Sequence, residues 1–211
     1  MRADGHTSVA PATVGSGELR KYVVRRLDEG QTWAIAAASG APRLWSYGST
    51  AALHGFESGF ADDLRGIPRL QRAVGQARRS FLNACGALIE RRMPDVAFLA
   101  LALDGASIHV VCAGNVRAYV FRGRQSQRIT PRVDHESGLL DGRIATASEP
   151  LNGGDLVMAG SASAFSTRAV GRVSAVLQGD PQTPPAVIAN LLTDPARKAG
   201  VGAAAVVLRA R

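Results

Sequence analysis

The sequence predicts an α+β fold in which antiparallel sheets carry helices on their outer faces. Three observations lead to this prediction. Residues 97–103 form an uncharged apolar run, which is typical of a strand that is covered on both faces. Strand-like segments follow one another closely, separated by short turns that contain glycine, as in β-hairpins. Residues 68–92 carry the clearest helical periodicity, and they interrupt the strand segments as one block.

The N-terminal residues differ in composition from the rest of the chain. Residues 1–17 are rich in Gly, Ser, Thr, Ala and Pro, so we expect a disordered tail there. Residues 18–211 are then expected to form a single domain, which is long enough to bury a core. No apolar run approaches the roughly 20 residues that span a bilayer, and the tail lacks the apolar segment of a secretory signal. We therefore expect a cytoplasmic protein with no membrane segment.

The next segments predict a hairpin and then a helix. Residues 21–27 and 32–38 have the composition of two strands joined by a short turn. Residues 43–66 contain four glycines and are ambiguous, with a short helix expected at residues 49–54. In residues 68–92 the apolar side chains recur at alternating steps of four and three, which predicts a helix with one buried face.

Three strands are predicted in the middle of the chain, at residues 97–103, 107–112 and 116–122. Asp104-Gly105 and Gly114-Asn115 are the turn signals between them. Tight turns between successive strands predict an antiparallel meander.

The C-terminal part alternates short strand and helix signals. Strands are expected at residues 128–130, 143–148, 155–159 and 203–208, and helices at residues 161–173 and 185–192. The resulting order of strands, helix block, strands, helix block and strand fits the α+β class.

The charge distribution and the cysteine content argue against a nucleic-acid interface and a zinc site. The formal net charge of +8 favours acidic partners. The arginines are scattered, however, and no basic run is interleaved with aromatic residues, so nucleic-acid binding remains only a third and weaker hypothesis. Cys85 and Cys112 are expected to be buried reduced thiols. No further Cys or His lies at the spacing of zinc ligands, so we expect no zinc site.

Three motifs resemble a known family. Residues 113–120 (AGNVRAYV) and 133–137 (VDHES) are similar to the "GDSRAYL … DHS" core of the type-2C (PPM) metal-dependent serine/threonine protein phosphatases. Residues 154–163 (GDLVMAGSAS) resemble that family's "G-D-x-L-L-L-x-S-D-G" strand. The family-motif positions expected to be structural are Gly114, Asn115, Arg117, Asp134, His135 and Asp155.

The resemblance covers roughly residues 20–210 and implies a more specific fold than the patterns alone. That fold is a four-layer αββα sandwich of two antiparallel sheets flanked by helices. The resemblance also implies two Mg²⁺ or Mn²⁺ ions held by aspartates, with a bridging water that attacks a phosphoryl group. Such hard cations require anionic oxygen ligands, and two of them clamp the water and the phosphate oxygens.

The aspartates that should hold these metals are missing from the matching positions. The three aspartate positions of the family fall on Ser39, Ala162 and Val201. The residues that directly follow them here are Gly40, Ser163 and Gly202. Asn115 also replaces the aspartate of "GDSR". Hydroxyl and hydrocarbon side chains bind hard cations weakly or not at all. The sequence therefore predicts a degenerate cleft without metal or other cofactor, which is left as a contact surface for a partner.

Other carboxylates offer substitute ligands. They are Glu57, Asp62, Asp63, Asp95, Asp134, Glu136 and Asp141. We expect each of them to be a solvated loop charge or a cap. A serine nucleophile is not expected, because no G-x-S-x-G turn is present.

Two hypotheses are stronger than nucleic-acid binding. In the first, the chain is a pseudophosphatase that binds a protein partner in Ser/Thr phosphorylation signalling: a kinase, a phosphatase or a phosphoprotein. The degenerate cleft and the variable residues 43–66 are its expected contact regions. In the alternative, the chain is an active phosphatase that holds Mg²⁺ or Mn²⁺ with non-standard ligands.

Overall fold

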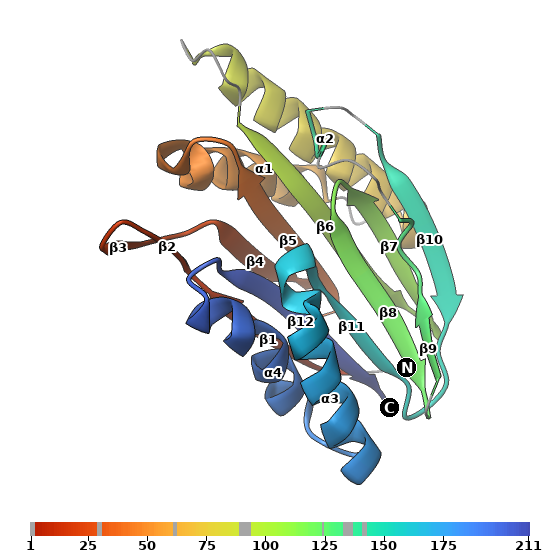
Figure 1. The fold of residues 1–211 in the computed structure, drawn as a ribbon. Coiled ribbons are helices and arrows are strands. Elements are labelled where there is room, and N and C mark those ends of the chain that lie inside the picture. The colour runs from red at the N-terminus through yellow and green to blue at the C-terminus, as the bar shows by residue number, and fades with distance from the viewer. Residues whose placement is uncertain are drawn as a thin grey trace.

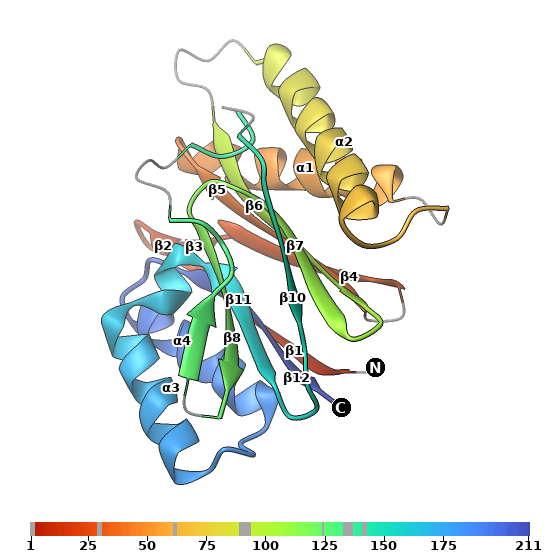
Figure 2. The ribbon, with the colours of Figure 1, turned by 90° about the vertical axis from the view of Figure 1, so that its right-hand side faces the viewer.

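Two antiparallel sheets pack face to face at the centre of the structure, and helices cover both outer faces (Figure 1; Figure 2). The computed structural model describes residues 3–28, 31–60, 63–88, 94–123, 125–132, 137–140 and 143–211. Within these residues each large sheet has five strands. The layers run helices, sheet, sheet, helices, which is the predicted α+β sandwich.

The first sheet has the strand order β10-β7-β6-β5-β4. Its strands are β4 (Tyr22–Leu27), β5 (Thr32–Ser39), β6 (Asp95–Asp104), β7 (Ser107–Ala113) and β10 (Ala145–Pro150). The second sheet has the order β1-β12-β11-β8-β9. Its strands are β1 (Ala3–Ala10), β8 (Val116–Arg122), β9 (Gln125–Arg128), β11 (Leu156–Ser161) and β12 (Ala203–Ala210).

The helices form the two outer layers. The helices α1 (Trp45–Gly59) and α2 (Gly66–Gly86) cover the first sheet, and α3 (Thr167–Gly179) and α4 (Pro185–Lys198) cover the second. Smaller elements are the hairpin of β2 (Ala12–Val14) and β3 (Gly17–Leu19) and the 3₁₀ turns η2 (Pro42–Leu44) and η3 (Ala162–Phe165). No helix in the described ranges combines the length and the apolar content needed to cross a bilayer.

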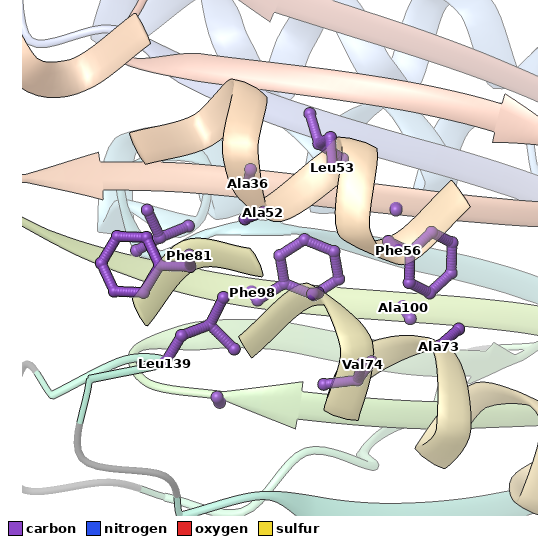
Figure 3. Packing of buried hydrophobic residues seen from close by; sticks show 14 of the residues in the cluster. Ala36, Ala52, Leu53, Phe56, Ala73, Val74, Phe81, Phe98, Ala100 and Leu139 are labelled. Atoms are coloured by element: carbon purple, nitrogen blue, oxygen red, sulfur yellow. The ribbon is translucent and has the colours of Figure 1, made fainter. Parts of the chain in front are cut away.

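Strand β6 lies in the middle of the first sheet and contributes to two cores. Phe98 and Ala100 face α1 and α2 (Figure 3), whereas Leu99 and Leu101 face the second sheet. All four side chains are fully buried. This arrangement confirms the prediction that the uncharged run would be covered on both faces, because a strand between two apolar layers has no polar side.

The predicted three-strand meander is wrong at its last strand. β6 and β7 form the expected hairpin, but β8 pairs with β11 and β9 in the other sheet. The far edge of β7 is occupied by β10. Gly114, with φ of +80°, and Asn115 thus carry the chain from one sheet to the other and are not a hairpin turn.

The disordered tail predicted for residues 1–17 is also wrong for the described residues. β1 pairs with β12 along its whole length, from Ala3 with Ala210 to Ala10 with Ala203. Gly5 is needed there, because a Cβ would lie 2.8 Å from Trp33 and 2.9 Å from Leu208. The small residues that indicated disorder instead allow β1 to pack closely over the inter-sheet core.

Residues 43–66, ambiguous in the sequence, form η2, α1 and the start of α2, with residues 61–62 outside the described ranges. α2 ends at Gly86, earlier than the predicted Arg92, and residues 89–93 are likewise not described. The glycines of α1 permit helix packing: a Cβ on Gly55 would lie 2.6 Å from the Cβ of Ser80. Glycine thus allows α1 and α2 to approach closely.

We expect Gly55→Ala to lower the free energy of unfolding by about 1–3 kcal/mol, because overpacking outweighs the gain in helix propensity of about 1 kcal/mol. Gly171, exposed in α3, is the matched control, since a Cβ there meets nothing within 4 Å. Gly171→Ala should raise the same quantity by roughly 0.5–1 kcal/mol. Urea unfolding of both variants measures the difference. If the two substitutions change stability in the same direction, α1 and α2 do not pack as described.

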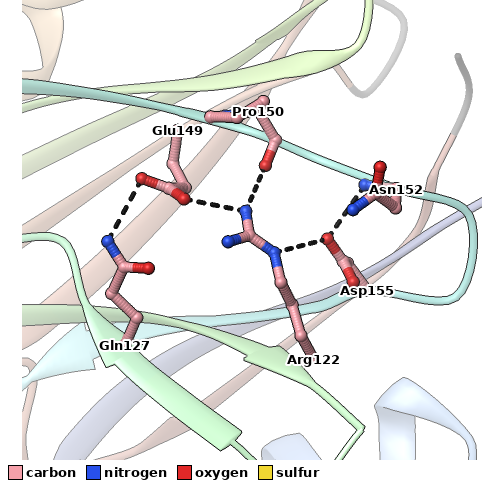
Figure 4. Close-up of polar contacts among 6 residues, drawn as sticks. All are labelled: Arg122, Gln127, Glu149, Pro150, Asn152 and Asp155. Atoms are coloured by element: carbon pink, nitrogen blue, oxygen red, sulfur yellow. Dashed lines mark hydrogen bonds and ion pairs between the residues drawn. The ribbon is translucent and has the colours of Figure 1, made fainter.

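A polar clamp joins the two sheets near the end of β8 (Figure 4). The Arg122 guanidinium donates to Glu149 of β10 at 2.8 Å and to Asp155, just before β11, at 3.2 Å. It also donates to the carbonyl oxygen of Pro150. The bonds to Glu149 and then to Asp155 raise the pKa of Arg122. Asp155 in turn accepts the backbone N–H of Asn152, so one buried carboxylate fixes both the clamp and the turn before β11.

Both cysteines are buried and free, which confirms the prediction of reduced thiols. Burial raises the pKa of Cys112 to about 11 from its ordinary value of 9.0. Between these two values the unfolded chain has lost the thiol proton and the folded chain has kept it. Folding stability should therefore be intact below about pH 9 and should fall as the pH rises toward 11.

At about pH 11 the ionisation of Cys112 in the unfolded chain should have lowered the free energy of unfolding by about 2–3 kcal/mol relative to neutral pH. Urea unfolding of the wild type and of Cys112→Ala at pH 7 and pH 11 measures it, because other titrating groups cancel in the double difference. The stability gap between the two proteins should shrink at pH 11. A gap that is equal at both pH values would mean that the folded protein tolerates the Cys112 thiolate.

Candidate functional site

A small cleft opens at one end of the sandwich, where the two sheets meet. Its cavity volume is about 130 Å³. The residues that line it are Lys21, Tyr22, Ala37, Ala38, Ser39, Ala97, Asn115, Ser161, Ala162 and Ser163. They come together because antiparallel pairing places the end of β5 beside the starts of β4 and β6, and the end of β11 beside the start of β8.

A chain of hydroxyl groups forms the wall contributed by β11 and η3. The backbone N–H of Ala204 donates to the Ser161 hydroxyl at 3.1 Å. Ser161 and Ser163 lie 2.9 Å apart, and Ser163 donates to the Tyr22 hydroxyl oxygen at 3.2 Å. The Ser161 hydroxyl also has a second acceptor, the carbonyl oxygen of Ala204 at 3.5 Å, and either serine can donate in the Ser161–Ser163 contact. The three hydroxyl groups thus form one connected wall of the cleft.

Lys21 supplies the only formal charge among the lining residues that the structure describes. Its ammonium nitrogen lies 5.2 Å from the ring centroid of Trp45 and 5.6 Å from that of Tyr22. Both distances are within the range of cation–π interaction. The aromatic rings thus hold a cation at the cleft, and no acidic side chain of the described residues forms an ion pair with it.

Asp95, at the start of β6, fixes the loop of residues 137–140 beside the cleft. Its carboxylate accepts backbone N–H groups from Val96 at 2.7 Å, Gly138 at 2.6 Å and Leu140 at 3.0 Å. The Ser39 hydroxyl donates weakly to the Asp95 carbonyl oxygen at 3.4 Å. The Asp95 carboxylate is therefore committed to the backbone of the loop.

Solved structures superpose on almost the whole chain. The serine/threonine phosphatase PstP/Ppp of Mycobacterium tuberculosis aligns with a TM-score of 0.82 at 13% identity, covering 99% of both chains. The PPM Ser-Thr phosphatase MsPP of Mycobacterium smegmatis, in complex with cacodylate, aligns with a TM-score of 0.76 at 18% identity, covering 99% of this chain and 98% of its own. The chain has the fold of the PPM serine/threonine phosphatases.

A third PPM-fold structure, PppA of Pseudomonas aeruginosa, covers 100% of this chain and 99% of its own, with a TM-score of 0.72 at 18% identity. It is described as a key regulatory component of the type VI secretion system, T6SS. No protein-family model and no curated protein matches the sequence. The likeness is thus one of fold, and it confirms the four-layer αββα architecture that the motifs implied.

The PPM fold implies a binuclear metal site, and the described residues that line this cleft do not fit one. Those of its lining residues that the structure describes include one ammonium, several hydroxyls, one amide and methyl groups, but no carboxylate. Divalent magnesium and manganese require anionic oxygen ligands. Among the described residues no group of three or more His, Cys, Asp and Glu side chains could hold a metal ion. A fixed cation such as Lys21 would also repel a divalent ion placed in the same cleft.

The substitute carboxylates within the described ranges have other partners. Glu57 forms an ion pair with Arg25 at 3.1 Å, and Asp63 lies 3.9 Å from Arg72. Asp95 binds the loop, as described above. The remaining candidates, Asp62, Asp134, Glu136 and Asp141, lie outside the described residues.

The structure brings together four of the predicted site residues. Ser39, Ala162, Ser163 and Asn115 line the cleft, although they come from distant parts of the sequence. The other three predicted cleft residues, Gly40, Val201 and Gly202, are not among its lining residues.

The contacts of those three residues explain why. The carbonyl oxygen of Gly40 accepts the indole N–H of Trp45 at 3.2 Å. Val201 is 50% exposed. Gly202 packs against the chain between β1 and β2, where a Cβ would lie 2.9 Å from the carbonyl oxygen of Ala10.

The family-motif positions serve structural contacts where they are described. Gly114 packs against the loop, since a Cβ would lie 2.7 Å from the Ser137 carbonyl oxygen. Arg117 points to the helical layer and donates to the Phe165 carbonyl oxygen at 3.1 Å. Asp155 forms the clamp with Arg122. The roles predicted for Asp134 and His135 remain predictions, because both lie outside the described residues.

The sequence analysis missed Lys21 and Tyr22 as cleft residues. Sequence patterns place both at the start of a strand, and β4 begins at Tyr22, one residue after Lys21. The informative signal was composition: Lys21 is one of only two lysines in a chain whose other cationic side chains are arginines. Their position in the cleft, however, depends on the pairing of Tyr22 with Ala37, which no local pattern reveals.

Proposed function

We propose that this chain is a pseudophosphatase: a PPM-fold module that binds a protein in Ser/Thr phosphorylation signalling and does not hydrolyse phosphate through bound metals. The observation that carries the proposal is the chemistry of the cleft, which has a lysine and neutral side chains where metal-binding carboxylates would be needed. By contrast, the catalytic domain of PstP has been crystallised with two manganese ions.

The partner we propose is a kinase, a phosphatase or a phosphoprotein. Support comes from the fold, because solved structures with this fold include phosphatases and the regulatory component PppA. The surface around the cleft is the proposed contact region, since hydroxyl, amide and ammonium groups line the cleft and the short turn η3 borders it. The segment of residues 43–66, of which α1 is the main part, is the second contact region that we propose.

Assays of hydrolysis and of metal binding test the proposal that the chain does not hydrolyse phosphate through bound metals. The protein is incubated with an aryl phosphate and a phosphoserine peptide in excess Mn²⁺, with the catalytic domain of PstP as a positive control. We expect no turnover above buffer and no heat of Mn²⁺ binding by calorimetry. Hydrolysis that depends on Mn²⁺ would instead establish the alternative, an active phosphatase with non-standard ligands, and would refute the proposal.

Capture of a partner tests the proposal that the chain binds a signalling protein through the surface around the cleft. The wild type is compared with Asn115→Trp, which places an indole in the cleft, and with Gln178→Trp, the same change at an exposed site on α3. A phosphorylation-signalling protein should be retained by the wild type and by Gln178→Trp and lost from Asn115→Trp. Equal capture by all three proteins would exclude the cleft as the contact region.

A further inference from the structure

We propose that a groove on the outer face of the second sheet docks an acidic peptide segment of a partner protein, in which apolar side chains lie between two acidic ones. The groove lies between α3 and the strands β8 and β9, on the face of the sheet that points away from the first sheet. The inference goes beyond the proposed function, because it uses a different surface and does not depend on the chemistry of the cleft.

The groove exists because α3 does not pack as closely on the sheet as α4 does. α4 packs closely on β1 and β12, whereas the close backbone neighbours of α3 are α4 and η3. Two cavities remain beside α3, with volumes of about 200 Å³ and about 240 Å³. Phe121 lines both, and α3 contributes Val173 to the first cavity and Leu177, one turn later, to the second. The two cavities therefore form one groove that follows α3.

The floor of the groove and its helical wall are apolar. Tyr119 and Phe121 of β8 are only partly buried, and they pack against the core beneath α3. Val170, on the helical wall, is 43% exposed. Apolar side chains that line a hollow open to water are stabilised when another apolar surface covers them. The centre of the groove thus favours apolar side chains of a partner.

Two arginines stand at one end of the groove. Arg117 and Tyr119 lie on the same face of β8, and Arg128 of β9 is paired with Tyr119 in the strand register. Arg117 donates to the carbonyl oxygen of Phe165 at 3.1 Å, and Arg128 donates to that of Pro131 at 2.8 Å. Neither guanidinium forms an ion pair with an acidic side chain of the described residues. Because neutral carbonyl oxygens do not cancel a formal charge, this end of the groove is cationic.

A third arginine stands at the other end. Arg209 lines the groove and donates to the carbonyl oxygen of Thr183, in the loop between α3 and α4, at 3.0 Å. Its Nε–H is buried, and no residue in the described ranges accepts it. Asp155, the acidic residue of the described lining, already accepts the guanidinium of Arg122 and forms no ion pair with Arg209. A cation without an acidic partner therefore marks this end of the groove as well.

The strand register sets the spacing between the two cationic ends. Leu156 pairs with both Phe121 and Arg209, so Arg209 lies level with Phe121, four residues along the sheet from Arg117. At 3.3–3.4 Å per residue this spacing is roughly 13 Å. An extended peptide covers the same length with two acidic residues four positions apart, and the side chains between them meet the apolar floor. The formal net charge of +8 favours such an acidic partner over a second copy of this chain.

Calorimetric titration with synthetic peptides at low salt tests the docking groove. The probe is a peptide with the core Glu-Leu-Phe-Leu-Glu. Its controls carry Gln in place of Glu, Lys in place of Glu, or Ser in place of the three apolar residues. We expect the probe to bind and each control to bind about tenfold more weakly or not at all, because charge and apolar contact both contribute. Added salt should weaken the binding of the probe, since exposed charges are screened.

Amide chemical shifts measured by NMR during the same titration locate the peptide. The amides of Phe121, Val173 and Leu177 should shift, and those of Ser39 and Ala97, which line the cleft on the first sheet, should not. Shifts confined to the cleft residues would show that the peptide binds there and would overturn the groove as its site.

Matched variants assign the binding to the groove. Ser174→Trp, which fills the groove from α3, should weaken binding of the probe about tenfold or more. Ala175→Trp, at the next and exposed position of α3, should leave the affinity within about twofold. Arg128→Gln and Arg209→Gln should each weaken binding about threefold to tenfold. Arg26→Gln, an exposed position of β4 in the first sheet, removes the same charge and should leave the affinity within about twofold. The melting temperature of each variant shows whether a loss of binding comes from unfolding.

The docking groove and the pseudophosphatase proposal fail in different ways. No binding of the probe up to about 1 mM, or equal weakening by Ser174→Trp and Ala175→Trp, would overturn the groove and leave the proposal for the cleft intact. Dimerisation in sedimentation experiments that Ser174→Trp abolishes would show that a second copy fills the groove, and would also overturn the acidic partner. Hydrolysis dependent on Mn²⁺ would overturn the pseudophosphatase, and peptide binding in the groove would stand.

Discussion

Replacing Phe98 with alanine should lower the free energy of unfolding by about 3–5 kcal/mol, the usual cost of deleting a large buried aromatic side chain. Phe98 is fully buried in the core between the first sheet and α1 and α2 (Figure 3). Its ring centroid lies 5.5 Å from that of Phe56. Because α1 and α2 pack on this side chain, they cannot close the cavity that its loss would leave.

Two further variants show that β6 contributes to two cores. Leu101 faces the second sheet, and Leu101→Ala should lower stability by about 2–5 kcal/mol. Val187→Ala, at an exposed position of α4, should change it by less than about 0.5 kcal/mol. Urea unfolding at neutral pH measures the free energy of unfolding of the three variants. A small effect at either Phe98 or Leu101 would mean that the strand is covered on one face only, which is incompatible with four layers.

Replacing Asp95 with alanine should cost roughly 3 kcal/mol of unfolding free energy, since hydrogen bonds to a charged group contribute about 1.5–3 kcal/mol each and the loop is partly exposed. The carboxylate accepts the backbone N–H groups of Val96, Gly138 and Leu140. Without it, the loop beside the cleft loses two of its anchors. Hydrogen exchange of the Gly138 and Leu140 amides should accelerate along with the loss of stability.

The conservative variant separates hydrogen bonding from charge. Asp95→Asn keeps one acceptor oxygen, so its free energy of unfolding should lie between those of the wild type and Asp95→Ala. The control is Asp63→Ala, where an exposed carboxylate lies 3.9 Å from Arg72, and the change should be below about 1 kcal/mol. Equal stability of Asp95→Ala and Asp63→Ala would show that Asp95 does not hold the loop.

Much of the fold could be predicted because local patterns carried the information. The uncharged run at residues 97–103 indicated a strand buried on both faces, and β6 is such a strand. The periodicity at residues 68–92 indicates a helix, and α2 buries the first four residues of the predicted stripe, from Leu70 to Phe81, but not Ala84 or Leu88. Burial on one or both faces of an element follows from the order of its own side chains.

The sequence-based predictions are wrong where pairing between distant segments decides the structure. The small and polar residues of β1 predict a disordered tail, but β12 supplies a strand partner some 200 residues later along the chain. The glycine turn before β8 predicts a meander, but Gly114 leads into the other sheet. Composition and turn signals are local, and neither contains the identity of the neighbouring strand.

At the cleft, the identity of the side chains at the motif positions follows from the sequence alone: Ser39, Ala162 and Val201 lack the carboxylates that a hard cation needs. Which of these residues meet depends on the packing of the two sheets. It placed Ser39 and Ala162 together and excluded Val201, and it added Lys21 and Tyr22, which no motif had marked. The reason is that ligand chemistry belongs to single residues, whereas a site is formed by strand ends that sheet packing brings within reach of one another.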